Sequence, residues 1–260
     1  GGAAPGAPPP YRLVVVGEST AVGVGAAEHA RALPGFLAEA LARRLRRRVA
    51  WSVAGENGAT ARRVARLARG WTTGPRDGPA GGREAADLVV VTVGINDLIR
   101  RRSLARWAAD VADLVAVLRR GYGGAAVLVA GMPPVHRFPA LPRPLRTVLG
   151  ARARAMDRIL GEAARAGGAV HAPMDEAIAR DRALFAADGF HPSPAGYRAW
   201  AHDLAAAVEA AVEAAVEAGV EAGVEAGVES GVESGVEAGV EAGVESGVEA
   251  GTATAKGAAT

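Results

Sequence analysis

The sequence predicts an α/β protein in which a parallel β-sheet is covered by helices on both faces. Five short apolar runs, rich in β-branched residues, are typical of strands that are buried on both faces. Between these runs, apolar residues recur at spacings of three and four, as they do on one face of a helix. This alternation indicates right-handed βαβ units, and in such a sheet the ligand site lies beyond the carboxyl ends of the strands.

Strands and helices alternate along most of the chain. The predicted strands are Leu13–Val16, Val49–Val53, Leu88–Val93, Ala126–Ala130 and Ala169–His171. The predicted helices are Pro34–Arg47, Thr60–Ala68, 103–120, Leu145–Ala166 and 194–218. The segment 103–120 is the clearest helix, because its apolar residues share one face, Ser103 can cap its start and Gly121 can end it.

Composition divides the chain into three parts. Residues 1–10 are rich in Pro and Gly and are expected to be a flexible segment rather than a signal peptide. Residues 11–218 are expected to form the folded domain. Residues 219–260 are of low complexity: a four-residue unit based on Val-Glu-Ala recurs as far as Ala250, with a glycine at every fourth position from Gly219. A period of four drifts about 40° per repeat on a helix, and each glycine costs about 1 kcal/mol relative to alanine. We therefore expect a low-complexity tail that is marginally helical or disordered.

The formal charge of +2 is unevenly distributed. Residues 1–208 hold 29 arginines and 17 acidic residues, whereas 209–260 hold 11 glutamates and one lysine. Such a basic body is compatible with an anionic partner. However, lysine is nearly absent beside abundant Ala, Arg, Gly, Val and Pro, which indicates a compositional bias of the source genome, so we expect no nucleic-acid partner.

The absence of cysteine excludes a disulfide framework, a thiolate metal site and a cysteine nucleophile. No run of 18 apolar residues is present, so no transmembrane helix is expected. We expect a cytoplasmic location, with secretion left open because the chain does not begin with Met. The oligomeric state is also left open.

Four polar segments follow predicted strands or precede the last helix, and they are therefore expected to meet at the ligand-binding edge of the sheet. They are Gly17-Glu18-Ser19-Thr20, Ala54-Gly55-Glu56-Asn57-Gly58-Ala59-Thr60, Gly94-Ile95-Asn96-Asp97 and Asp188-Gly189-Phe190-His191-Pro192. Each alone has an ordinary structural explanation, since a serine after a strand is usually a helix N-cap and a Gly-x-Asn-Asp segment is usually a turn. Together they contain the groups that acyl transfer requires.

Ser19 is the candidate nucleophile, because a sharp turn from a strand into a helix would direct its hydroxyl toward this edge. His191 is the candidate general base, which takes the serine proton and later returns it to the leaving group. Asp188 lies three residues before His191, so one loop can carry both and the carboxylate can fix the tautomer of the imidazole. The candidate oxyanion donors are the backbone N–H groups of Ser19 and Gly58 and the side-chain amide of Asn96.

In this order and spacing, the four segments resemble the conserved blocks of the SGNH/GDSL hydrolase family over about residues 11–208. The matching positions are Ser19 in block I, Gly58 in block II, Asn96 in block III, and Asp188 with His191 in block V. The resemblance implies a three-layer α/β/α fold with a flavodoxin-like five-stranded parallel sheet. It also implies hydrolysis of small acyl esters, as in esterases, lipases, thioesterases or deacetylases, without a metal or organic cofactor.

Two departures from the family pattern are visible. Glu18 stands where aspartate is more common. The hydrogen bonds of this side chain therefore cannot be predicted from the family pattern, but Ser19 is still the predicted nucleophile. Block II contains both Gly55 and Gly58, and the Gly-Ala-Thr context favours Gly58 as the donor. The order Ser, Asp, His without a Gly-x-Ser-x-Gly elbow argues against the α/β-hydrolase fold.

The proline-rich loop 132–142 follows the fourth predicted strand and should border the site. Phe138 and Leu141 are candidates to line an acyl pocket. A stiff connection that packs on its own body explains the same residues equally well.

Two other functions remain open on the sequence alone. Gly17-Glu18-Ser19-Thr20 is a candidate anion cradle for FMN or phosphate in a flavodoxin-like binding module. That function would leave Asn96 and the Asp188/His191 pair unexplained. The other alternative is a non-catalytic scaffold in which the repeat tail carries the function.

Overall fold

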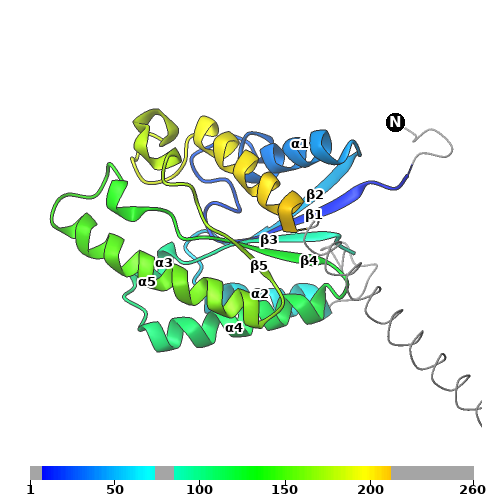
Figure 1. The fold of residues 1–260 in the computed structure, drawn as a ribbon, viewed down its shortest axis with the longest axis horizontal. Helices are drawn as coiled ribbons and strands as arrows, with labels where there is room; N and C mark the ends of the chain where they lie inside the picture. The colour runs from blue at the N-terminus through cyan, green and yellow to red at the C-terminus, as the bar shows by residue number, and fades with distance from the viewer. Residues whose placement is uncertain (1–7, 74–84, 212–260) are drawn as a thin grey trace, which may run out of the picture. The chain divides into compact units, whose positions relative to one another are not determined.

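The computed structural model describes residues 8–73 and 85–211, and its centre is a five-stranded parallel sheet in the order β2-β1-β3-β4-β5 (Figure 1). The strands are β1 (Tyr11–Gly17), β2 (Val49–Gly55), β3 (Leu88–Thr92), β4 (Ala126–Ala130) and β5 (Val170–Ala172). All five predicted strands are confirmed, each with its ends shifted by two residues or fewer. This strand order is that of flavodoxin-like proteins, in which ligands bind where the order reverses, between β1 and β3.

Helices connect the strands as the alternation predicts. The α-helices are α1 (Leu33–Leu45), α2 (Ala61–Thr73), α3 (Ile95–Ile99), α4 (Leu104–Gly121) and α5 (Leu145–Ala166), followed by a helix over 194–211. The short 3-10 helices are η1 (His29–Arg31), η2 (Val135–Arg137), η3 (Ile178–Arg180) and η4 (Arg182–Leu184). Ser103 caps α4 by accepting a hydrogen bond from the Arg106 N–H at 3.4 Å, as the sequence predicts.

One of these α-helices, α3, was not predicted. The segment that contains Asn96 and Asp97 is expected from sequence to be a turn, yet it forms the single-turn helix α3. Gly94 precedes this helix with φ 127°, and its carbonyl accepts a hydrogen bond from the Leu98 N–H at 2.9 Å. A five-residue helix is too short to show a periodic apolar face in the sequence.

Successive residues of the strands contribute to two separate cores, which confirms the predicted three-layer α/β/α fold. Val14 and Val16 of β1 pack with α2, α4 and α5 on one face of the sheet. Leu13 and Val15 pack with α1 and the helix over 194–211 on the other face. Figure 1 shows the two helical layers on opposite sides of the sheet.

β2 is an exception to the burial that the sequence predicts. No residue of this strand is fully buried, and the Trp51 side chain is 37% exposed. β2 forms the edge of the sheet beside β1, so only one of its sides has a neighbouring strand.

The compact unit that contains the sheet ends at Glu209, and a second unit covers Ala210–Thr260. The predicted tail over 219–260 lies outside the described residues, as do residues 1–7 of the predicted flexible N-terminal segment. Within the described ranges, no helix combines the length and apolar character needed to span a bilayer.

Candidate active site

Ser19 lies two residues beyond the end of β1, at the carboxyl edge of the sheet. The sequence predicts a strand-to-helix turn here, but residues 19–25 form successive turns and the next helical residue is His29. The Glu18 carbonyl accepts from the Ala21 N–H at 3.0 Å, and the Ser19 carbonyl accepts from the Val24 N–H at 2.9 Å. These bonds fix the loop directly around a serine that is only 6% exposed.

A second loop presents Asp188 and His191. It folds back on itself, because Phe185 pairs with Pro192 and the Ala186 N–H donates to the His191 carbonyl at 2.8 Å. Within it, one Asp188 oxygen, Oδ1, accepts from the backbone N–H groups of Phe190 at 2.9 Å and His191 at 3.0 Å. The carboxylate is therefore fixed by its own loop.

The two loops bring three predicted catalytic side chains into one line. His191 Nδ1 lies 2.6 Å from Asp188 Oδ2, and His191 Nε2 lies 3.2 Å from Ser19 Oγ. With the carboxylate facing Nδ1, a neutral imidazole carries its proton on that nitrogen and leaves Nε2 free to accept the serine proton. This is the arrangement of an activated nucleophile with an oriented base.

Packing between the two loops maintains this alignment. Gly25, with φ 97°, lies so close to the second loop that a Cβ there would be 2.5 Å from the Pro192 carbonyl oxygen. The fully buried Tyr197, in the helix over 194–211, donates its hydroxyl to the Val24 carbonyl at 2.5 Å. The serine loop is thus attached to the element that follows His191.

The environment of Asp188 favours its ionised form. Partial burial alone would raise the pKa of Asp188. The hydrogen bonds from His191 and from the Phe190 and His191 N–H groups outweigh that effect and lower the pKa. A carboxylate that stays charged can stabilise an imidazolium as it forms.

Asn96 is connected to Ser19 through Glu18, which precedes Ser19 in the chain and bonds to the Asn96 side chain. The Asn96 amide nitrogen, Nδ2, donates to Glu18 Oε2 at 2.7 Å and to the Ala59 carbonyl at 3.1 Å. Glu18 also accepts from the backbone N–H groups of Ile95 at 3.3 Å and Asn96 at 3.4 Å. Both amide hydrogens of Asn96 therefore have acceptors, and an oxyanion at this site would compete with one of them.

Glu18 is a buried carboxyl group beside the candidate nucleophile. Its side chain is enclosed, and burial raises the pKa of Glu18 to about 7 although hydrogen bonds from Asn96 and Ile95 oppose that shift. The longer side chain of glutamate at this position reaches the amide of Asn96, so the departure from aspartate noted in the sequence has a defined structural consequence.

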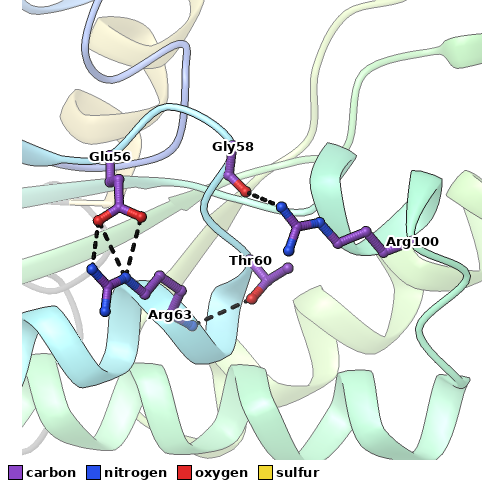
Figure 2. Close-up of polar contacts among 5 residues, drawn as sticks. All are labelled: Glu56, Gly58, Thr60, Arg63 and Arg100. Atoms are coloured by element: carbon purple, nitrogen blue, oxygen red, sulfur yellow. Dashed lines mark hydrogen bonds and ion pairs between the residues drawn. The ribbon is translucent and has the colours of Figure 1, made fainter.

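The segment between β2 and α2 contains Gly58, which Figure 2 shows with its polar neighbours. Gly58 has φ 79°, a conformation that favours glycine, and its carbonyl accepts from Arg100 at 3.1 Å. A Cβ on Gly58 would meet only the end of the Arg100 side chain, at 4.0 Å. Glu56 and Arg63 form an ion pair at 2.7 Å across the start of α2. The space beside Gly58 is therefore open, and the loop around it is held by two arginines.

Gly55 has a different environment. It ends β2 in register with Gly17, and a Cβ there would lie 2.6 Å from the Gly17 carbonyl oxygen. Close approach of the two strand ends explains this glycine. Whether the Gly58 N–H serves as an oxyanion donor stays a prediction.

A pocket opens beside Ser19 and His191 across the carboxyl ends of β3 and β4. Its apolar lining comprises Val93, Ile95, Ala130, Pro133, Pro134, Phe138, Met174, Ile178, Ala179, Leu184, Phe185, Phe190, Pro192 and Trp200. Phe138 stacks edge-on against Phe185 at 5.5 Å and against Phe190 at 5.2 Å between ring centroids. Leu141, the other candidate, is absent from this lining and packs against the hydrophobic core.

Comparison with known proteins agrees with this geometry. Residues 15–199 match the GDSL-like Lipase/Acylhydrolase family. The chain belongs to this family. A GDSL-like esterase of Mycobacterium tuberculosis is 33% identical over 199 residues, which are 74% of this chain and 59% of the relative. The GDSL-like chain described here thus spans less than two thirds of that relative's length.

Solved structures share the fold of this GDSL-like domain at lower identity. A lipase/acylhydrolase from Enterococcus faecalis is 20% identical with a TM-score of 0.54, over 77% of this chain and 96% of that one. The esterase EstA from a Pseudoalteromonas species, inhibited by monoethylphosphonate, is 12% identical with a TM-score of 0.59, over 78% of this chain and 98% of that one.

Sequence reasoning missed several residues of the GDSL-like site. Phe190 lies inside the Asp-x-x-His segment, so the sequence could have indicated that its side chain lies near the catalytic residues. Phe185, Ile178 and Trp200 line the pocket from segments without a motif, and only the folded chain brings them to Ser19. The carboxyl of Glu18 was noted as a departure, but its contact with Asn96 depends on the separate strand β3.

Proposed function

We propose that this chain is a serine hydrolase that cleaves carboxylic esters through an acyl-enzyme intermediate. The observation that carries the proposal is the aligned set of Ser19 Oγ, His191 Nε2 and Asp188 Oδ2, with separations of 3.2 Å and 2.6 Å along the chain of hydrogen bonds. Membership of the GDSL-like lipase/acylhydrolase family supports the same reaction class.

In the proposed first step, Ser19 Oγ attacks the ester carbonyl carbon while His191 Nε2 takes the hydroxyl proton. Asp188 stabilises the resulting imidazolium. Collapse of the tetrahedral intermediate breaks the bond to the alcohol oxygen, which receives the proton from His191. Water then attacks the acyl-serine with the same base, and the acid product and free serine are released.

The proposed oxyanion donors are the Ser19 N–H, the Gly58 N–H and the Asn96 amide. For Asn96 this role requires one of its hydrogens to turn from Glu18 or Ala59 toward the developing charge. Such a donor acts mainly in the transition state, where the negative charge is greatest.

The pocket lined by Phe138, Phe185 and Phe190 is the proposed acyl site. Its apolar lining favours the hydrocarbon part of an ester. The alternative of an anion cradle at Ser19 receives less support, because the buried carboxyl of Glu18 adjoins it and the segment after Ser19 consists of turns rather than a helix N-terminus.

The test is ester hydrolysis by single and double variants. Ser19→Ala and His191→Ala should each lower kcat for nitrophenyl esters by on the order of 10³-fold or more, and the double variant should be scarcely worse than either. Asp188→Asn should cost less, since the edge contact with the Phe190 ring, at 5.3 Å between centroids, also positions the imidazole. An organophosphonate should modify Ser19 in the intact enzyme. Multiplicative losses in the double variant would show that Ser19 and His191 act independently and would overturn the triad.

A further inference from the structure

A second hollow, here called the arginine hollow, lies beside the catalytic pocket. It is lined by the side chains of Arg137, Arg143, Arg146, Arg154 and Arg180 together with His136, and no acidic residue contributes to its lining. Five guanidinium groups around one concave surface form a site with the geometry that phosphate oxygens favour, because each can donate two parallel hydrogen bonds.

The hollow depends on close packing between α5 and η2. Arg146, Gly150 and Arg154 are spaced by four residues and therefore share one face of α5. A Cβ at Gly150 would lie 2.5 Å from the Cβ of His136. Glycine at this position lets η2 approach the helix, which brings His136 and Arg137 between the two arginines of α5.

The positive charge of the hollow is largely uncompensated. Arg143, Arg146 and Arg154 form no side-chain hydrogen bond or ion pair with any residue in the described ranges. Other arginines of the chain form ion pairs, as Arg12 does with Asp87 at 2.9 Å. Glu176 pairs with two lining residues, Arg137 at 3.0 Å and His136 at 3.7 Å.

The positive charge of the hollow also affects the pKa of His136. Burial lowers the pKa of His136, Glu176 opposes this effect, and Arg137 and Arg154 lower the pKa further. The buried Nδ1 of His136 has no hydrogen-bond partner among the described residues. An anionic ligand in the hollow would compensate the guanidinium groups and offer an acceptor near this ring.

The hollow and the catalytic pocket share a wall. Arg137, the last residue of η2, lines the hollow, whereas the next residue, Phe138, lines the pocket. In η3, Ile178 lines the pocket, Arg180 lines the hollow and Ala179 lines both. The two surfaces are therefore adjacent and are separated by η2 and η3.

We propose that the arginine hollow binds a phosphoryl group on the leaving-alcohol or leaving-thiol side of the ester substrate. This proposal rests on the proposed ester hydrolysis at Ser19. The pocket beside Ser19 has a mostly apolar lining and is the proposed acyl site, so we assign a charged phosphate to the other side of the scissile bond. The substrate class is thus an acyl ester or thioester of a phosphorylated leaving group.

The first experiment compares two matched substrates, the butyrate esters of glycerol and of glycerol 3-phosphate, at constant ionic strength. The phosphorylated ester should be the better substrate by on the order of 10- to 100-fold in kcat/KM, chiefly through a lower KM, because charge-assisted hydrogen bonds form at its phosphate. Equal kcat/KM values for the two esters would overturn the proposal.

The second experiment removes two arginines from the hollow. Arg146→Gln/Arg154→Gln should abolish the preference for the phosphorylated ester and leave hydrolysis of the glycerol ester unchanged. The matched control is Arg158→Gln/Arg165→Gln, which removes the same charge from exposed positions of the same helix. An equal loss in both double variants would indicate a general charge effect and would contradict a specific site.

A binding measurement separates this proposal from the hydrolase proposal. Inorganic pyrophosphate should bind Ser19→Ala in calorimetry and lose its affinity in the hollow variant, whatever the outcome of the ester assays. Absence of binding would overturn the inference while leaving ester hydrolysis untouched.

Vesicles distinguish a soluble phosphate from a lipid headgroup as its source. Sedimentation with phosphatidylglycerol vesicles but not with phosphatidylcholine vesicles, dependent on Arg146 and Arg154, would identify the phosphorylated leaving group as a lipid. Without such sedimentation, preference for the phosphorylated glycerol ester identifies a soluble substrate.

Discussion

At the scale of single residues, Glu18 links the nucleophile to the candidate oxyanion donors. It precedes Ser19 in the chain, and its carboxyl group accepts hydrogen bonds from the Asn96 amide and from two backbone N–H groups at the start of α3. A change at Glu18 would therefore affect both the position of Asn96 and the acceptors that compete for its hydrogens.

The first residue-scale prediction concerns the oxyanion donors. Asn96→Ala should lower kcat by about 10²–10³-fold with a smaller effect on KM, because the amide is proposed to bind charge that appears in the transition state. Steady-state kinetics with nitrophenyl esters measures both constants. A raised KM with unchanged kcat would make Asn96 a residue that binds the ground state.

The same assay separates the two glycines of block II. Gly58→Val and Gly55→Val are compared, with circular dichroism to show which variants are folded. Gly55→Val should mainly destabilise, since its side chain would meet the Gly17 carbonyl. Gly58→Val should lose kcat, because its φ of 79° disfavours valine and the donor N–H would move.

The second residue-scale prediction concerns the pH dependence of stability. The pKa of Glu18 rises from the model-peptide value of 4.5 to about 7 in the folded chain. Between these values the folded state binds more protons than the unfolded state, so the free energy of unfolding should fall as pH rises through this window. The contribution of Glu18 is on the order of 3 kcal/mol.

Denaturant unfolding of the wild type and of Glu18→Gln at several pH values from 4 to 8 measures this contribution. The stability difference between the two proteins should shift in favour of Glu18→Gln as pH rises, because glutamine carries no buried charge. A difference that stays constant with pH would contradict a raised pKa for Glu18.

At the scale of secondary-structure elements, Asp97 joins α3 to α2. Its side chain is fully buried, and Oδ2 accepts from the Ala61 N–H, the first of α2, at 2.9 Å. This bond satisfies a backbone donor that the helix itself cannot pair. The second polar residue of the Gly-x-Asn-Asp segment therefore has a structural role, whereas Asn96 bonds to Glu18 beside the candidate nucleophile.

The element-scale prediction follows from that bond. Asp97→Ala should lower the free energy of unfolding by about 1–3 kcal/mol, because it leaves a helix N–H unpaired and a small cavity. Asp97→Asn should cost less, since the amide oxygen still accepts. Thermal and denaturant unfolding measure both. The prediction fails if alanine and asparagine are equally destabilising.

At the scale of the whole molecule, all the candidate catalytic residues and the arginine hollow lie within the unit that ends at Glu209. Deleting residues 219–260 should therefore change kcat/KM by less than about threefold and leave Tm within a few degrees. The repeat pattern also supports this, because a valine at every fourth residue would drift around a helix and could bury little surface. A large drop in Tm on truncation would show that the repeat packs on the body.

The sequence by itself determined the layers of this fold and the local groups of the site. Apolar runs and helical periodicity are local signals, so the five strands, α4 and α5 could be predicted from them. The pairing of Asp188 with His191 also needs only a three-residue spacing within one loop. Edge position could not be predicted for β2, because the order of strands depends on packing rather than on local pattern.

Only the tertiary structure decided which distant groups meet. The distance between Ser19 and His191, the reach of Glu18 to Asn96 and the aromatic lining around Phe138 each join segments that are far apart in the chain. Leu141 and Phe138 are three residues apart and both contact the hydrophobic core, yet only Phe138 also lines the pocket. The arginine hollow arises in the same way: close contact at Gly150 brings η2 against α5, and η3 adds Arg180, although no sequence pattern connects these arginines.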